Sequence, residues 1–223
     1  LRKLKDDDDV KAVVFRVNSP GGSAYISEQI WKEVVELKAK KPIVVSMSNY
    51  AASGGYYISC AANKIIAERT TLTGSIGVFG VVRNFTGTFD KLGVTTDIVK
   101  TNTYADLGDF TRPMREDEKA LIQRGVEQTY DLFLTRCADG RGMTKAEIDS
   151  IGQGRVWTGE TAQELGLVDV LGGIDDALEI AVNKAGIENY TVVSYPSKLD
   201  FLSSLLGVKP TNYVESQILQ SNL

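Results

Sequence analysis

The chain contains no histidine among its 223 residues. Without an imidazole, a serine or cysteine nucleophile lacks its usual base, and a zinc site lacks a common nitrogen ligand. The two cysteines, Cys60 and Cys137, are far apart in sequence and indicate neither a disulfide framework nor a metal site. We interpret both as small buried hydrophobic residues and expect no metal and no cofactor.

Long hydrophobic runs and an excess of positive charge are also missing. No stretch approaches the roughly 18 uninterrupted apolar residues that indicate a membrane-spanning helix. No secretory signal is visible, and the chain begins at Leu1 rather than at methionine, so we expect it to be a piece of a longer protein. A net charge of −4 gives no basic surface for nucleic acid, and we expect no such partner.

Strand-like and helix-like segments alternate along most of the chain. The strand-like segments are residues 10–18, 42–49, 63–68, 75–82, 95–101 and 190–196. The helix-like segments are residues 23–40, 54–62, 115–139 and 172–186, and a short helix is expected to begin at Thr144, where "TKAE" has the spacing of a capping box. This alternation predicts an α/β fold in which helices cover a mostly parallel sheet.

Two glycine-rich turns each follow a strand-like segment and precede a helix-like one. The first, "NSPGGSA", supplies Gly21 and Gly22, and the second, "YAASGGYY", places Ser53 at the start of a helix. Ligands bind at this edge of an α/β sheet, where helix starts leave backbone N–H groups without partners. Glycine amides aimed into a cleft can hold an oxyanion, and Ser53 is then the candidate nucleophile.

Each turn also has a structural explanation. A Pro-Gly-Gly sequence is common wherever a positive φ is needed, and small residues suit any tight helix start. Tyr56 and Tyr57 can line a substrate groove or simply pack in the core. A Ser53 nucleophile further requires a buried lysine as its base, and we interpret both Lys64 and Lys100 as solvated surface residues.

Several ordered motifs resemble a known family. "RVNSPGG", "YAASGGYYIS", "TLTGSIGV", "KLGV" and "VWTGETAQELGLVD" are similar to motifs of the protease IV-type signal peptide peptidases, serine peptidase family S49. The resemblance covers roughly residues 10–185 and implies a crotonase-like (Clp protease-like) fold and a Ser-Lys dyad. On that basis Ser53 matches the nucleophile, Gly21 and Gly22 match the oxyanion turn, and Ser75 matches the serine that orients the lysine.

The chain departs from the family where the catalytic lysine is expected. Short members have a Tyr-Lys-Asp-like motif, but this chain has Ala105 between Tyr104 and Asp106. Long members carry two related halves, in which the N-terminal half supplies the lysine and the C-terminal half the serine. We therefore expect this chain to be a C-terminal half without its own base, and to show little proteolysis alone. An engineered lysine-to-alanine change in a short member is the alternative.

The resemblance also implies an organisation and partners. We expect a peptidase domain over residues 1–190 and a C-terminal strand with a peripheral helical tail over 191–223. The expected partners are cleaved signal peptides or other short hydrophobic peptides, the N-terminal half and further copies of the chain. The expected location is the extracytoplasmic side of a membrane. Two rival functions stay open: a non-catalytic peptide-binding or assembly module, favoured by Ala105, and a crotonase-type acyl-CoA enzyme.

Overall fold

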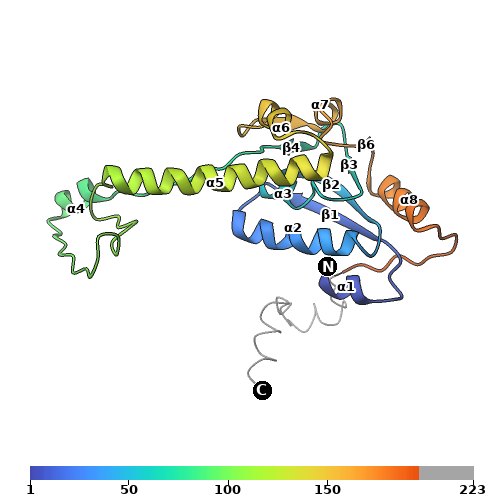
Figure 1. Cartoon of the computed structure of the whole chain (residues 1–223), viewed down its shortest axis with the longest axis horizontal. Helices are drawn as coiled ribbons and strands as arrows, with labels where there is room; N and C mark the ends of the chain where they lie inside the picture. Colours follow the sequence, from blue (N-terminus) through green and yellow to red (C-terminus); the bar gives the residue numbers. More distant parts are fainter. Residues whose placement is uncertain (196–223) are drawn as a thin grey trace, which may run out of the picture. The chain divides into compact units, whose positions relative to one another are not determined.

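The computed structural model describes residues 1–195, and these separate into a large unit, Leu1–Gly186, and a second unit that begins at Ile187. The strands are β1 (Val13–Ser19), β2 (Ile43–Ala52), β3 (Lys64–Ala67), β4 (Leu72–Gly74), β5 (Val156–Thr158) and β6 (Val170–Leu171). The helices are α1 (Arg2–Asp6), α2 (Ala24–Lys38), α3 (Gly54–Tyr57), α4 (Thr86–Leu92), α5 (Glu116–Arg141), α6 (Lys145–Ile151), α7 (Gly159–Glu164) and α8 (Ile174–Ala185). All of them lie in the large unit (Figure 1).

The strands form one sheet centred on β2. The order is β5-β4-β2-β3-β6, with β1 also paired to β2. All pairings are parallel except that between β4 and β5. The predicted mostly parallel sheet is therefore confirmed.

Alternating residues of β2 divide the core between the two faces of the sheet. Val45 and Met47 belong to the main apolar cluster, which also contains buried residues of α3 and α5. Val44 instead packs with Ala177 and Ala181 of α8. Because successive side chains of a strand point to opposite faces, the apolar run in β2 is buried from both sides.

Local signals in the sequence fix several helix ends. Ser23 caps α2 by accepting the Ile26 N–H, and Thr144 and Glu147 form the predicted capping box of α6. Gly186 ends α8 in the left-handed conformation, with φ of 64°. The helix expected over residues 54–62 is shorter, because α3 ends at Tyr57.

Two of the expected strands do not form. Residues 75–82 and 95–101 are in neither a strand nor a helix, and most of them are exposed. Ser75 has a positive φ of 48°, so the chain leaves the sheet directly after β4. β-branched composition favoured strands there, but within the described residues no neighbouring strand pairs with either segment.

The long helix α5 carries α4 and the loop between them away from the sheet (Figure 1). With 26 residues it spans about 39 Å at 1.5 Å per residue. Its C-terminal half packs in the main core through Phe133, Leu134 and Cys137, whereas its N-terminal half supports the loop. No helix within residues 1–195 is both long and apolar enough to cross a membrane.

Of the second unit, only residues 187–195 are described. The strand expected at 190–196 is not formed over residues 190–195, which have no regular secondary structure. The remainder of the expected tail, residues 196–223, lies outside the described residues.

Candidate active site

The two glycine-rich turns meet beside the ends of β1 and β2. A Cβ atom added to Gly21 would lie 2.7 Å from the Cβ of Ser53, and one added to Gly54 would lie 3.2 Å from the Gly22 nitrogen. Gly55 is equally close to the end of β1, since its added Cβ would lie 2.5 Å from the Ser19 carbonyl oxygen. The small residues of the two motifs therefore have a structural role: they allow the turns to come together.

Ser53 occupies a strained turn between β2 and α3. Its φ of 52° and ψ of −119° are unusual for a residue with a side chain and cost roughly 1–3 kcal/mol. Its N–H donates to the Gly74 carbonyl, and its own carbonyl accepts the Tyr57 N–H, which holds the backbone in place. The Ser53 hydroxyl makes no hydrogen bond to any of the described residues.

A cavity of about 290 Å³ opens in front of Ser53. The lining is partly polar, from the turn residues and the start of α2, and partly apolar. The lining residues are Gly22, Ser23, Ala24, Ser27, Ser53, Gly54, Tyr57, Gly77, Val78, Phe79, Thr129 and Phe133. The cavity therefore combines a free hydroxyl, backbone amides and an apolar wall formed by Tyr57, Val78, Phe79 and Phe133, which suits a peptide carbonyl carrying an apolar side chain.

The backbone amides around the cavity differ in availability. The Gly21 N–H already donates to the Ser19 hydroxyl, 3.2 Å away. Within the described residues, the Gly22 N–H makes no hydrogen bond. The Gly54 N–H lies in the first turn of α3, where helix geometry provides no acceptor. Gly22 and Gly54 are thus the better-placed pair of donors; Gly54 was not singled out from sequence, although it directly follows the candidate nucleophile.

Ser75 lies near Ser53 but outside the cavity lining. Ala52 and Gly74 are register partners in β2 and β4, so Ser53 and Ser75 each come one residue after the same paired position. The Ser75 N–H donates to the Arg155 carbonyl, 2.7 Å away. The structure brings Ser75 beside Ser53 in a second strained backbone conformation; its expected role in orienting a lysine stays a prediction.

An ion-pair network holds Tyr57, one of the apolar residues that line the cavity. The Tyr57 hydroxyl donates to Glu28 at 2.5 Å, and Arg136 donates to the same carboxylate at 2.6 Å. The Arg136 guanidinium lies over the Trp31 ring, 3.9 Å from its centroid. Burial, then the hydrogen bond to Glu28, raises the pKa of Tyr57, so this hydroxyl remains a donor and fixes the ring.

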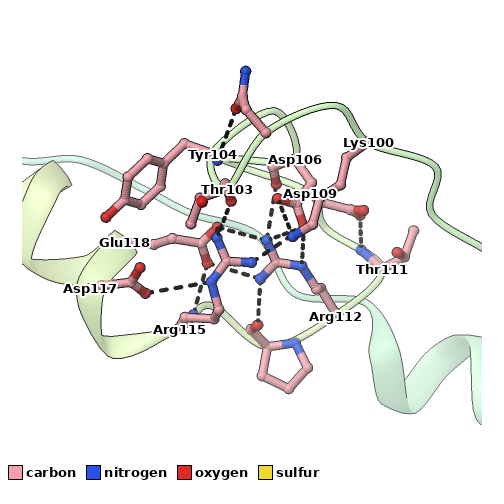
Figure 2. Close-up of polar contacts among 12 residues, drawn as sticks. Lys100, Thr103, Tyr104, Asp106, Asp109, Thr111, Arg112, Arg115, Asp117 and Glu118 are labelled. Atoms are coloured by element: carbon pink, nitrogen blue, oxygen red, sulfur yellow. Dashed lines mark hydrogen bonds and ion pairs between the residues drawn. The ribbon is translucent and has the colours of Figure 1, made fainter.

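Ala105 is held away from the cavity. Figure 2 shows the segment around it tied to the start of α5 by Arg112 and Arg115. Arg112 donates to Asp106 at 2.7 Å and to Glu118 at 2.6 Å. From Glu118 to Thr129, the first α5 residue that lines the cavity, the helix rises roughly 16 Å.

The cavity lining contains no lysine, and the residues that the structure describes form no cluster of three or more metal-ligating side chains. The site therefore presents a hydroxyl, two amides and an apolar wall, but no general base from residues 1–195. Of the predicted site residues, Ser53, Gly21, Gly22 and Ser75 are brought together, and Ala105 is not among them.

The chain is similar to known peptidases. Residues 35–188 match the model of peptidase family S49. The chain is 44% identical to Protease 4 of Salmonella typhi over 212 residues, which covers 93% of this chain and 34% of that protein. It is 39% identical to a putative signal peptide peptidase SppA of Enterococcus faecium, covering 94% of this chain and 61% of that protein.

A solved structure shows the same fold. A ClpP1 variant from Listeria monocytogenes matches with a TM-score of 0.50 and 16% identity, over 74% of this chain and 76% of that one. The predicted crotonase-like (Clp protease-like) α/β fold is therefore confirmed. With the family model matched over most of the sheet and over α5 to α8, the chain belongs to peptidase family S49.

Proposed function

We propose that this chain is the nucleophile-bearing part of a serine peptidase in which a lysine from outside the chain acts as the base. The observation that carries the proposal is the Ser53 hydroxyl, unbonded and facing a cavity next to the Gly22 and Gly54 amides. Membership of family S49 supports peptide-bond hydrolysis as the reaction.

The mechanism would be acyl transfer. The Ser53 oxygen attacks the peptide carbonyl as the lysine amine takes its proton. The N–H groups of Gly22 and Gly54 then stabilise the oxyanion, a contribution that typically exceeds about 2.7 kcal/mol per donor. The protonated amine returns the proton to the leaving nitrogen, and water releases the acyl group from Ser53.

The missing base is the reason for placing the lysine outside this chain. Desolvation has to lower the pKa of a lysine base towards neutrality, which requires an amine buried beside Ser53, and no lysine lines the cavity. The chain spans about a third of Protease 4 of Salmonella typhi, so much of that relative has no counterpart here. A second, related half that supplies the amine is consistent with this difference in length.

We propose short hydrophobic peptides, including cleaved signal peptides, as substrates. The apolar side of the cavity, formed by Tyr57, Val78, Phe79 and Phe133, supports this class. The relative from Enterococcus faecium is named a putative signal peptide peptidase. Assembly with further copies and attachment to the extracytoplasmic side of a membrane remain proposals that follow from the family.

A serine-reactive fluorophosphonate probe tests the nucleophile. In the complete protein we expect labelling on the Ser53 peptide, its loss in Ser53→Ala and its retention in Ser27→Ala. Ser27 is a matched control because it lines the same cavity while its hydroxyl donates to the Ser23 carbonyl. Absence of labelling in the folded, complete protein would refute the proposal.

The second candidate is a non-catalytic peptide-binding or assembly module. The cavity without a lysine and the alanine at position 105 favour it. It predicts that hydrophobic peptides bind equally well to the unmodified protein and to Ser53→Ala, with no covalent labelling of either. Mass spectrometry of the probe-treated protein distinguishes the two candidates.

A further inference from the structure

The two cysteines, far apart in sequence, are neighbours in the fold. Cys60 follows α3 and Cys137 lies in α5, and neither is accessible to solvent. Both are free thiols in this structure, and the Cys60 side chain is close enough to that of Cys137 to contribute to its raised pKa.

The backbones that carry these thiols are also in close contact. The Cys60 thiol donates to the Arg136 carbonyl, one residue before Cys137, at 3.5 Å. A Cβ atom added to Gly140 would collide with the Cys60 carbonyl, so the helix lies directly against the segment that carries Cys60. A disulfide forms only between cysteines whose Cα atoms lie roughly 4.4–6.8 Å apart, so contact between the two segments is its first requirement.

We propose that Cys60 and Cys137 are the site of an intrachain disulfide, closed by exchange with a small-molecule disulfide. One cysteine, as its thiolate, attacks the reagent disulfide, forming a mixed disulfide and releasing one reagent thiol. The second cysteine then attacks the mixed disulfide and releases the second reagent thiol. The protein loses two protons and two electrons, and the reagent is reduced by the same amount.

The environment of the thiols decides when this exchange occurs. Burial, together with the neighbouring Cys60 side chain, raises the pKa of the Cys137 thiol, which disfavours the reactive thiolate. In the folded chain the exchange therefore waits until α5 separates from the segment after α3. During folding, before the core closes, both thiols are accessible and the exchange is fast.

The crosslink would act on the candidate active site. Tyr57 lies three residues before Cys60 and Phe133 four residues before Cys137, and their ring centroids are 4.6 Å apart in the cavity wall. The bond would tie these two rings together. It would also close the loop that contains Ser75 and Ala105, restricting the unfolded chain over that whole stretch.

Refolding this chain in a mixture of oxidised and reduced glutathione tests the proposal. Free thiols are blocked with a maleimide, and the product is examined by intact mass and by peptide mapping. We expect a monomer that takes up no maleimide, is two mass units lighter and yields a linked Cys60–Cys137 peptide. The oxidised chain should melt roughly 5–15 °C higher than the reduced chain.

The variants Cys60→Ala and Cys137→Ala are the matched controls. Each retains one thiol, takes up one maleimide or one glutathione, and shows no such difference in melting temperature between oxidised and reduced samples. Comparison of the oxidised and reduced unmodified chain needs no substitution, so the test survives if a variant fails to fold. Two maleimides or two glutathione adducts on the folded monomer, or a lower melting temperature after oxidation, would overturn the proposal; none of these outcomes depends on peptidase activity.

Discussion

Gly21 approaches Ser53 so closely that an added Cβ atom would lie 2.7 Å from the Cβ of the serine and 2.9 Å from the Gly54 nitrogen. Gly21 also has a φ of 111°, which disfavours any residue with a side chain. We expect Gly21→Ala to lower the free energy of unfolding by about 2–4 kcal/mol and to displace Ser53. Chemical denaturation measures the first effect, and probe labelling of the complete protein measures the second.

Gly22→Ala is the control for this close contact. Gly22 also has a positive φ, 152°, but an added Cβ would meet no atom within 4 Å. Its substitution should cost about 1 kcal/mol, clearly less than that of Gly21. Equal losses of stability in the two variants would show that backbone strain, and not the approach to Ser53, explains the glycine at position 21.

The arrangement of the two turns could be predicted from sequence, because the rule used is general. Parallel strands end at the same edge of a sheet, so the residues that follow them come together. That rule predicts that Gly22 and Ser53 lie in one site. It also explains why Ser75, which follows β4, lies beside Ser53.

The parts that could not be predicted depend on contacts between distant segments. The proximity of Cys60 and Cys137 follows from the packing of α5 on the segment after α3, which no local pattern encodes. Residues 75–82 have strand-like composition but leave the sheet at Ser75, because a strand requires a neighbour and not only β-branched residues. The ion-pair cluster around Arg112 likewise joins a loop to a helix start.

That cluster predicts acid sensitivity of the loop before α5. Hydrogen bonding from Arg112 lowers the pKa of Glu118 to about 2. Burial alone would raise the pKa of Asp106, but hydrogen bonds from Lys100 and Arg112 outweigh it and lower this pKa to about 2 as well. The ordinary pKa is 3.8 for Asp106 and 4.5 for Glu118, so folding lowers the pKa of both carboxyl groups. The ionised carboxylates therefore stabilise the fold at any pH above their ordinary pKa values. This stabilisation is lost as the pH falls towards 2.

Hydrogen exchange of residues 101–112, corrected for the intrinsic pH dependence of the rate, measures this effect. Protection should be constant from pH 7 to pH 5 and fall between pH 4 and about 2. Glu118→Gln should produce the same loss at neutral pH. Glu116→Gln, on the exposed side of the same helix start, should not. Unchanged protection in Glu118→Gln would contradict a role for this network in holding the loop.

Tyr130 connects α5 to residues 149–153, and the residue that follows them is bonded to the chain beside the cavity. Its hydroxyl donates to Asp149 at 2.7 Å and accepts the Gln153 N–H at 3.0 Å. The neighbouring Gly154 N–H donates to the Ile76 carbonyl, next to the cavity residue Gly77. Burial and then the hydrogen bond to Asp149 raise the pKa of Tyr130 to about 12, so the hydroxyl stays a donor at any ordinary pH.

Removal of that hydroxyl should loosen the cavity edge without changing the core. We expect Tyr130→Phe to cost about 1–2 kcal/mol of unfolding free energy and to increase hydrogen exchange of residues 75–79. Thr135→Val, on the same helix, also removes a hydroxyl, but one that bonds only within the helix. It should leave exchange at 75–79 unchanged, and increased exchange in both variants would argue against a specific link through Tyr130.

The position of Ala105 predicts how a restored lysine would behave. The ion pairs to Asp106 hold this residue beside the start of α5, and from Glu118 the helix rises roughly 16 Å to Thr129, its first residue that lines the cavity. In Ala105→Lys the new amine should therefore be out of reach of Ser53 in the same chain. Fluorophosphonate labelling of Ser53 in the isolated variant should stay at the unassisted level at low protein concentration.

If labelling increases at all, the rate per molecule should rise with protein concentration, because the amine and the hydroxyl then come from different copies. A concentration-independent gain at high dilution would mean that residue 105 reaches its own serine, and that the described loop position is not the one in which the base acts.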